Sequence, residues 1–207
     1  MFSDAINALI DGHIICRVTK PDLFDYLAEK SHRDRVSSYL QQIGWRVVST
    51  HNQSGYFLVP HRPGEDTKSA LNSMHKKIMG DVRPMIEFLT LCLAATQSDS
   101  VLRPGDHIPE TKFAALIDES AKRRTDLQSL YARLIRGGGK TNTTEMLRAV
   151  LRALEQRGYL VEHGPSRELF VATGMVDAFH DLVDFLVENT PGAEETLDEP
   201  EVQGALL

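Results

Sequence analysis

One stretch of the chain, residues 121–172, gathers basic side chains whose type and spacing suit phosphate binding. It holds 10 Lys and Arg against 5 Asp and Glu, a net charge of +5. A guanidinium can donate two parallel hydrogen bonds to a phosphate, and a lysine ammonium attracts it as a point charge. Arg148 and Arg152 are spaced i, i+4 on a helical face opposite Leu147 and Leu151, so we expect both guanidiniums to be free for phosphate. The residues assigned to the DNA backbone are Lys122, Arg123, Arg124, Arg133, Arg136, Lys140, Arg148, Arg152 and Arg167.

An alternative reading of the same residues is a solvated helix surface. Glu145, Asp126 and Glu155 lie close by in the sequence and could pair with these cations, and exposed pairs of this kind contribute little to stability. Nothing in the pattern predicts base recognition, which needs side chains placed in a groove. The expectation is therefore contact with double-stranded DNA through phosphate, without choice of sequence.

A glycine run resembles the end of a nucleotide-binding loop but does not complete it. Gly137, Gly138 and Gly139 are followed by Lys140, whereas the motif also needs a glycine where this chain has Leu134. The run also follows a helical pattern, not a strand. We expect no nucleotide cofactor, and interpret the glycines as a hinge or as a close backbone approach to DNA or a partner.

The other reactive side chains predict no catalytic or metal site. The eight histidines fall in separate elements without metal-ligand spacing. Cys16 and Cys92 lie far apart in apolar stretches, so they are expected to be buried thiols. Asp177, Asp181 and Asp184 share one stripe of an amphipathic helix and are expected on its solvated face. An enzyme, a metal and a cofactor are not expected.

The elements that position these residues occur twice. Each copy is a helical pattern that ends at a glycine, followed at once by an aromatic residue and alternating apolar residues typical of a strand. Such self-similarity predicts a duplicated small unit. Val36, Tyr39, Leu40, Ile43, Gly44, Trp45 and Val47 recur 114 residues later as Val150, Ala153, Leu154, Arg157, Gly158, Tyr159 and Val161.

Turn-forming residues then predict a hairpin in each copy, with arms at 45–49 and 56–60 and at 159–162 and 168–172. The first helix presents Val36, Tyr39, Leu40 and Ile43 as one buried stripe, and the second is capped by Asn142. Three helices closed by a hairpin make a winged helix. The predicted fold is mainly α with small β-hairpins (α+β), as tandem winged-helix domains.

Four segments follow from this organisation. We expect an N-terminal winged-helix domain at 1–62, a helical connector at 63–98, a C-terminal winged-helix domain with a terminal helix at 99–188, and a disordered acidic tail at 189–207. Short strands are expected at 13–18 and 100–103. The connector is expected to form one or two helices over about 66–95, with a break near Pro84, because an interior proline loses a backbone hydrogen bond.

Composition fits a chain without membrane segments. The 207 residues are 42% apolar, and no apolar run approaches the roughly 20 residues that cross a bilayer. The net charge of −6 divides into −2 over residues 1–120, +5 over 121–172 and −9 over 173–207. We expect a cytoplasmic, nucleoid-associated protein whose basic segment lies in the second unit.

These residues together resemble the MksE/MukE family, and MksE more than MukE. The resemblance rests on the tandem units, on Gly12–His13–Ile14–Ile15, on Gly55–Tyr56–Phe57–Leu58–Val59–Pro60, and on the stretch from Leu147 to Gly158 before Tyr159 and a wing. The resemblance covers about residues 3–188 and depends on the order and spacing of these apolar scaffold positions. Family members are the kite subunits of bacterial SMC condensin complexes.

The resemblance implies a non-catalytic homodimer that binds a kleisin (MksF/MukF-like) and, through it, an SMC ATPase (MksB/MukB-like). Such complexes organise and segregate chromosomes, and similar Wadjet-type complexes defend against plasmids. Two other readings stay open on the residues alone. One is a homodimeric winged-helix transcriptional regulator, and the other is an adaptor whose winged helices contact proteins only.

Overall fold

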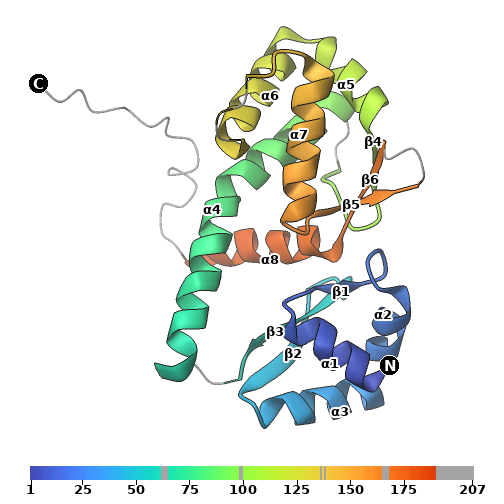
Figure 1. The fold of residues 1–207 in the computed structure, drawn as a ribbon, viewed down its shortest axis with the longest axis vertical. Coiled ribbons are helices and arrows are strands. Elements are labelled where there is room, and N and C mark those ends of the chain that lie inside the picture. The colour runs from blue at the N-terminus through green and yellow to red at the C-terminus, as the bar shows by residue number, and fades with distance from the viewer. Residues whose placement is uncertain (62–64, 98–99, 136, 138, 165–167, 190–207) are drawn as a thin grey trace, which may run out of the picture.

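The computed structural model describes residues 1–61, 65–97, 100–135, 137, 139–164 and 168–189, and of 65–78 the backbone alone. These ranges form eight helices and two three-stranded antiparallel sheets, which confirms a mixed α+β fold (Figure 1). None of the described helices combines the length and apolar character needed to cross a membrane. The predicted tail, apart from Asn189, lies outside the described residues.

The first sheet and three helices form what we call the N-terminal unit. Leu9, Leu27, Val36 and Leu40 are buried together in its hydrophobic core. Gly44 has φ +82°, a left-handed conformation that lets the chain leave a helix and enter a strand at once. The sheet order is β1-β3-β2. The elements are α1 (Phe2–Ile10), β1 (Ile15–Cys16), α2 (Pro21–Ala28), α3 (Lys30–Gln41), β2 (Trp45–Ser49) and β3 (Gly55–Pro60).

The second sheet and the remaining helices form the C-terminal unit around a larger core. Asn142 caps α7 as predicted, because its side chain accepts hydrogen bonds from the N–H groups of Thr144 and Glu145. The sheet order is β4-β6-β5. The elements are α4 (Glu65–Thr96), β4 (His107–Pro109), α5 (Glu110–Asp118), α6 (Ala121–Leu134), α7 (Thr143–Gln156), β5 (Leu160–His163), β6 (Leu169–Ala172) and α8 (Gly174–Asn189).

The predicted repetition of helix, glycine and hairpin is confirmed. Gly158 has φ +87°, like Gly44, and both hairpins lie within a residue or so of their predicted arms. The copies differ in one respect. Two helices separate the first strand from the hairpin in the N-terminal unit, whereas three do so in the C-terminal unit.

The predicted break at Pro84 is wrong, because α4 runs as one helix through it. An interior proline costs about 3 kcal/mol. Val82, Met85, Phe88 and Leu89 surround it and are all buried in the core of the C-terminal unit. Burying each such side chain stabilises by about 1.5–3 kcal/mol, so packing outweighs the lost backbone bond.

Two other local predictions are wrong. The strand expected at 100–103 lies instead at His107–Pro109, because the N–H of Arg103 bonds to the Asp106 carboxylate in a turn that precedes the strand. The stripe on α3 is only half buried. Val36 and Leu40 are fully buried, but Tyr39 is 47% exposed and Ile43, which lies beyond the helix end, is 51% exposed.

The two units meet where α8 lies against the turn between β2 and β3. Asp177 accepts hydrogen bonds from the Asn52 side chain at 2.7 Å and the Ser54 hydroxyl at 2.6 Å. Asp181 accepts one from the His51 N–H at 2.8 Å. The solvated face predicted for these acids is therefore wrong for Asp177, which is 3% exposed. We call these contacts the α8–turn junction.

Gly174, at the start of α8, has no room for a side chain at the junction. A Cβ atom there would lie 2.8 Å from Cys16 Cβ and 3.1 Å from the Ser54 carbonyl oxygen. We therefore expect Gly174→Ala to lower the free energy of unfolding by about 1–3 kcal/mol, because both neighbours are held by the backbone. Urea unfolding followed by circular dichroism measures this.

Gly80→Ala is the matched control. Gly80 is also helical, but nothing lies within 4 Å of an added Cβ, so this change is expected to be neutral or to stabilise by about 0.5–1 kcal/mol. Equal effects of the two substitutions would contradict the close approach at Gly174.

Candidate nucleic-acid interface

Arg148, on α7, is held in an ion pair with Glu110 at the start of α5. Its Nη2 lies 2.6 Å from Glu110 Oε1, and its Nε donates to Oε2 at 3.1 Å. Glu110 is 1% exposed, while the Arg148 side chain is 51% exposed. The hydrogen bond and the charge of Glu110 raise the pKa of Arg148. The guanidinium thus neutralises a buried carboxylate and shows only its outer side to solvent.

Arg152, one turn further along α7, bridges the helix to the second hairpin. Its Nη1 lies 2.9 Å from Glu155 Oε2 and its Nη2 lies 2.5 Å from Glu162 Oε1. The guanidinium also lies over the Phe170 ring, 5.5 Å from the centroid. The prediction that the guanidiniums of Arg148 and Arg152 are free is therefore wrong. The pairing with Glu155 weighed as the alternative is confirmed.

Arg123 and Arg124 turn back from the first turn of α6 to the end of α5. Nη1 of Arg123 donates to the Leu116 carbonyl at 2.6 Å, and Nη1 of Arg124 donates to the Asp118 carbonyl. Cations are favourable at the negative end of a helix, where the last carbonyls lack partners. Arg123 is only 14% exposed on its side chain and faces the protein, whereas Arg124 is exposed.

The remaining predicted residues differ in their surroundings. Arg133 Nε lies 3.1 Å from Glu87 Oε1 and ties α6 to α4. Lys122 and Lys140 are exposed, and neither pairs with a carboxylate among the described residues. Arg136 and Arg167 lie outside the described residues.

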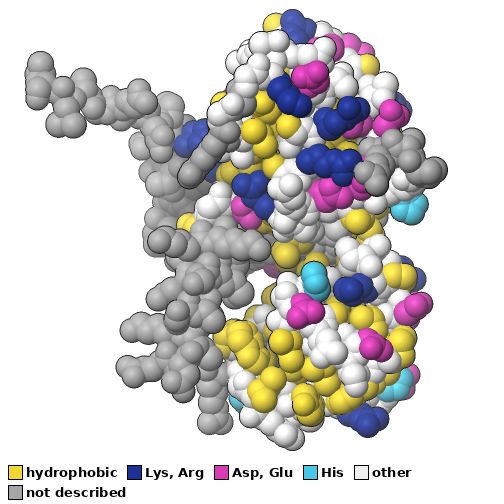
Figure 2. Space-filling model, viewed as in Figure 1, with side chains coloured by type: hydrophobic (Ala, Val, Ile, Leu, Met, Phe, Trp, Pro, Cys, Tyr) yellow, Lys and Arg dark blue, Asp and Glu magenta, His cyan; other side chains and the backbone are white. Residues whose placement is uncertain are grey.

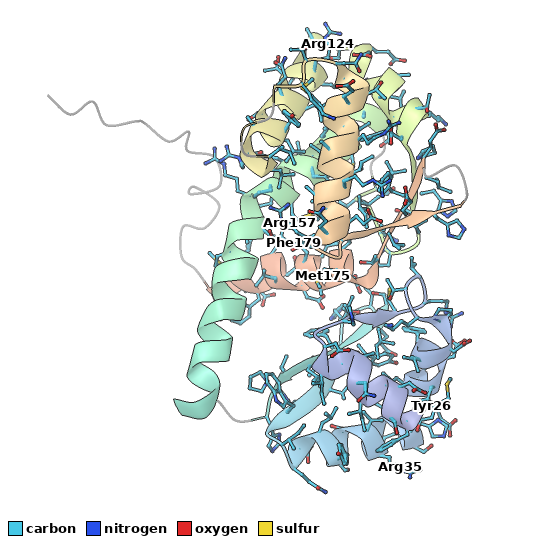
Figure 3. All side chains as sticks on the ribbon, in the orientation of Figure 1. Tyr26, Arg35, Arg124, Arg157, Met175 and Phe179 are labelled. Atoms are coloured by element: carbon cyan, nitrogen blue, oxygen red, sulfur yellow. The ribbon has the colours of Figure 1, made fainter. Side chains whose placement is uncertain are left out.

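The basic segment is therefore a surface of mixed charge. Figure 2 shows Lys and Arg side chains beside Asp and Glu over the C-terminal half of the molecule. Arg124 lies at the far end of this unit (Figure 3). Of the predicted cations that the structure describes, Lys122, Arg124 and Lys140 are the ones exposed without a carboxylate partner. Phosphate binding by any of these residues stays a prediction.

One further buried carboxylate has dedicated donors that the sequence pattern did not reveal. Asp81 on α4 lies 3.0 Å from Arg157 Nε and close to the Tyr159 hydroxyl. Burial, and then the charge of Asp81, raise the pKa of Tyr159. Arg157 and Phe179 lie near the crossing of α4, α7 and α8 (Figure 3). A buried acid and its partner can be 76 positions apart, as here, so no local spacing signals them.

The pKa of Asp177 at the α8–turn junction reflects two opposing effects. Burial raises it, but hydrogen bonds from Ser54, Asn52 and Thr50 together outweigh burial and hold the pKa below its ordinary value of 3.8. The stability contributed by this carboxylate is complete above that value and is lost as the pH falls through the lowered pKa. At neutral pH this carboxylate is therefore ionised and contributes its full share to stability.

The described side chains provide a scaffold and no assembled reactive centre. Within the described ranges, no cluster of three His, Cys, Asp or Glu side chains could hold a metal ion. Cys16 and Cys92 are buried thiols, as predicted. Burial raises the pKa of Cys92, which opposes thiolate chemistry. The described elements form a two-unit scaffold of helices and hairpins.

Comparison with protein families assigns the chain to a family. A family model described as condensin complex protein MksE matches residues 1–183. The chain therefore belongs to the MksE family, and as such is a subunit of a condensin complex. A search of curated proteins found no match.

The pair between Arg148 and Glu110 predicts a stability effect that a phosphate-binding side chain would not show. Arg148→Ala leaves the buried Glu110 carboxylate without its cation, so the free energy of unfolding should fall by about 2–3 kcal/mol. This is less than for a fully buried pair, because water reaches the outer side of Arg148. Urea unfolding measures the change.

Two comparisons separate the effect of the ion pair from that of side-chain packing. Lys122→Ala removes an exposed cation and should change stability by no more than about 0.5 kcal/mol. Arg148→Ala should cost markedly less in a Glu110→Gln background, because a neutral amide needs no counter-charge. The same cost in both backgrounds would show that packing, not charge, accounts for the effect.

Proposed function

We propose that the chain is the non-catalytic kite subunit of an MksBEF/MukBEF-like condensin. In this role it binds the kleisin and, through it, the SMC ATPase, and it holds DNA by its backbone to support chromosome organisation and segregation or plasmid defence. The match to the MksE family over residues 1–183 is the observation that carries the proposal. ATP hydrolysis belongs to the SMC partner.

The arrangement of elements supports a winged-helix interpretation of both units. In the N-terminal unit α1 precedes the first strand and α2 and α3 follow it, whereas in the C-terminal unit α5, α6 and α7 all follow the first strand. In both units a hairpin then adds two strands to the sheet. The first strand pairs with the last in both sheets. On this interpretation α3 and α7 are the third helices of two winged-helix domains, and residues 1–62 and 99–188 are those domains, joined by the connector at 63–98.

A homodimer would present two basic segments to one duplex. Lys122, Arg124 and Lys140 are the candidate phosphate-binding residues, because other cations of the C-terminal unit already neutralise Glu110, Glu87 or Glu162. So few cations per chain imply weak, salt-dependent binding without sequence choice. Two copies raise the effective concentration of the second binding surface. The complex would act on DNA in the cytoplasm, at the nucleoid.

Affinity purification from the native cell tests the proposal. A tagged copy is expected to retain a kleisin and a large coiled-coil ATPase at moderate salt, identified by mass spectrometry. Recovery of neither, with specific promoter fragments enriched instead, would support a transcriptional regulator and refute the condensin role.

If the exposed cations Lys122, Arg124 and Lys140 bind DNA phosphates, removing their charge should change the salt dependence of DNA binding. Replacing Lys122, Arg124 and Lys140 by Glu should weaken binding to a random duplex at low salt. The slope of log Kd against log salt should fall by about 0.9 for each phosphate that the variant no longer neutralises. Fluorescence anisotropy of the full chain over a salt series measures both quantities.

Arg46→Glu is the control for nonspecific charge effects. Arg46 is exposed on β2 of the N-terminal unit and has no ion pair among the described residues, so the charge change per site is the same. Its DNA affinity should stay close to that of the unchanged chain. An equal decrease in binding free energy per substituted site for both variants would mean that overall charge, not this surface, governs binding.

A further inference from the structure

The outer edge of β2 is an open strand edge. β2 is the outermost strand of the first sheet, whose order is β1-β3-β2 (Figure 1). The His61 N–H bonds to the Gly44 carbonyl at one end of the hairpin, and the Thr50 N–H bonds to the Gly55 carbonyl at the other. In an antiparallel pair the bonded residues alternate with residues whose main-chain groups face away.

This register assigns the two sides of β2. Arg46 and Val48 exchange hydrogen bonds with β3, whereas Trp45, Val47 and Ser49 direct their main-chain groups outward. Within the part of the chain that the structure describes, none of these outward N–H and C=O groups has a hydrogen-bond partner. The edge therefore offers three donors and three acceptors in a row.

The matching edge of the second sheet is partly covered by charged side chains. There the Thr173 N–H bonds to the Tyr159 carbonyl, so Leu160 and Glu162 are the outward residues of β5. The Glu162 N–H donates to Glu155 Oε1 at 3.1 Å, and Arg152 holds both carboxylates beside the strand. Proteins protect strand edges with charges in this way. β2 has no such cover from the described residues.

The side chains along β2 indicate what kind of strand would fit. Trp45 and Val47 are half buried and pack against the core of the N-terminal unit, so a neighbouring strand would need apolar residues on that side. Arg46 points to the other side and is exposed without an ion pair among the described residues. An acidic residue beside it would complete the pairing. Figure 2 shows apolar side chains over much of this unit.

We propose that β2 receives an extended segment of the partner polypeptide, which adds a fourth strand to the first sheet with apolar residues beside Trp45 and Val47 and an acid beside Arg46. This rests on the proposed function and names the site at which the kleisin would bind. Strand addition supplies affinity through main-chain bonds and specificity through alternate side chains.

Charge disfavours a second copy of this chain as the occupant. Two β2 strands paired antiparallel about Val47 would place the two Arg46 side chains diagonally on one face, about 7–8 Å apart. Like charges at that spacing repel. An acid-bearing segment avoids this cost and uses the unpaired guanidinium.

Proline substitution at Val47 tests the proposal. Proline removes the outward N–H and places its ring on the edge, but it leaves the bonds of Arg46 and Val48 to β3 in place. Val47→Ala is the control, because it removes more of the valine side chain than proline does and yet keeps the N–H. Tagged versions of the unchanged chain and both variants are purified from native cells in parallel, and the recovered kleisin is quantified by mass spectrometry.

The expected result is at least about a ten-fold lower kleisin recovery for Val47→Pro than for Val47→Ala, with unchanged DNA binding by the purified variants. Equal recovery with both variants would overturn the site while leaving the condensin role intact. Absence of kleisin from the unchanged chain would refute the proposed function, and the site with it.

Hydrogen exchange on the unchanged chain decides the question if Val47→Pro does not fold. Amides of Trp45, Val47 and Ser49 should exchange quickly in the free chain and about ten-fold or more slowly in the complex with the recovered kleisin. Those of Arg46 and Val48 should be protected in both states. Unchanged exchange at the three outward amides would refute strand addition.

Discussion

The arrangement of the two units depends on a buried carboxylate that accepts hydrogen bonds across the chain. Asp177 on α8 bonds to Asn52 and Ser54, 125 and 123 positions away, and Gly174 allows the backbones to approach at the same place. Hydrogen bonds to a charged group contribute about 1.5–3 kcal/mol each, more than neutral ones. This junction occupies the tip of the first hairpin, so that tip faces the C-terminal unit and not a nucleic acid.

Buried acids also explain why the basic segment at 121–172 forms a surface of mixed positive and negative charge. Glu110 and Asp81 are nearly excluded from water, and each takes an arginine from the end or face of α7. An uncompensated carboxylate at either place would cost several kcal/mol, so these arginines are required by the fold before any ligand arrives. Of the predicted cations, Lys122 and Arg124 stay exposed in the first turn of α6, and Lys140 stays exposed in the loop before α7. The N-terminal unit presents an open strand edge instead.

The structural features that could be predicted from the sequence are those that depend on residues close to one another in the chain. The turns after Gly44 and Gly158, the cap at Asn142 and the hairpin arms follow from backbone preferences that act over a few positions. The pairs of Arg148 with Glu110 and of Asp177 with Asn52 join residues 38 and 125 positions apart, and no spacing rule reports them. The predicted helix break at Pro84 was wrong for a related reason, because α4 is stabilised by packing against other elements of the C-terminal core. Local chemistry predicted the elements, and contacts between elements decided which cations stay free.

A distance measurement between the units tests the α8–turn junction most directly. Spin labels on Ser38→Cys in α3 and Lys122→Cys in α6 would report the distance between the two units. The native thiols, Cys16 and Cys92, are buried and therefore shielded from the label. Labelled chains are diluted with unlabelled ones, so that only distances within one chain are measured. Pulsed electron paramagnetic resonance should give a single narrow distance distribution that broadens on Asp177→Ala. A broad distribution in the unchanged chain, or one that Asp177→Ala does not alter, would contradict the junction as the constraint that joins the units.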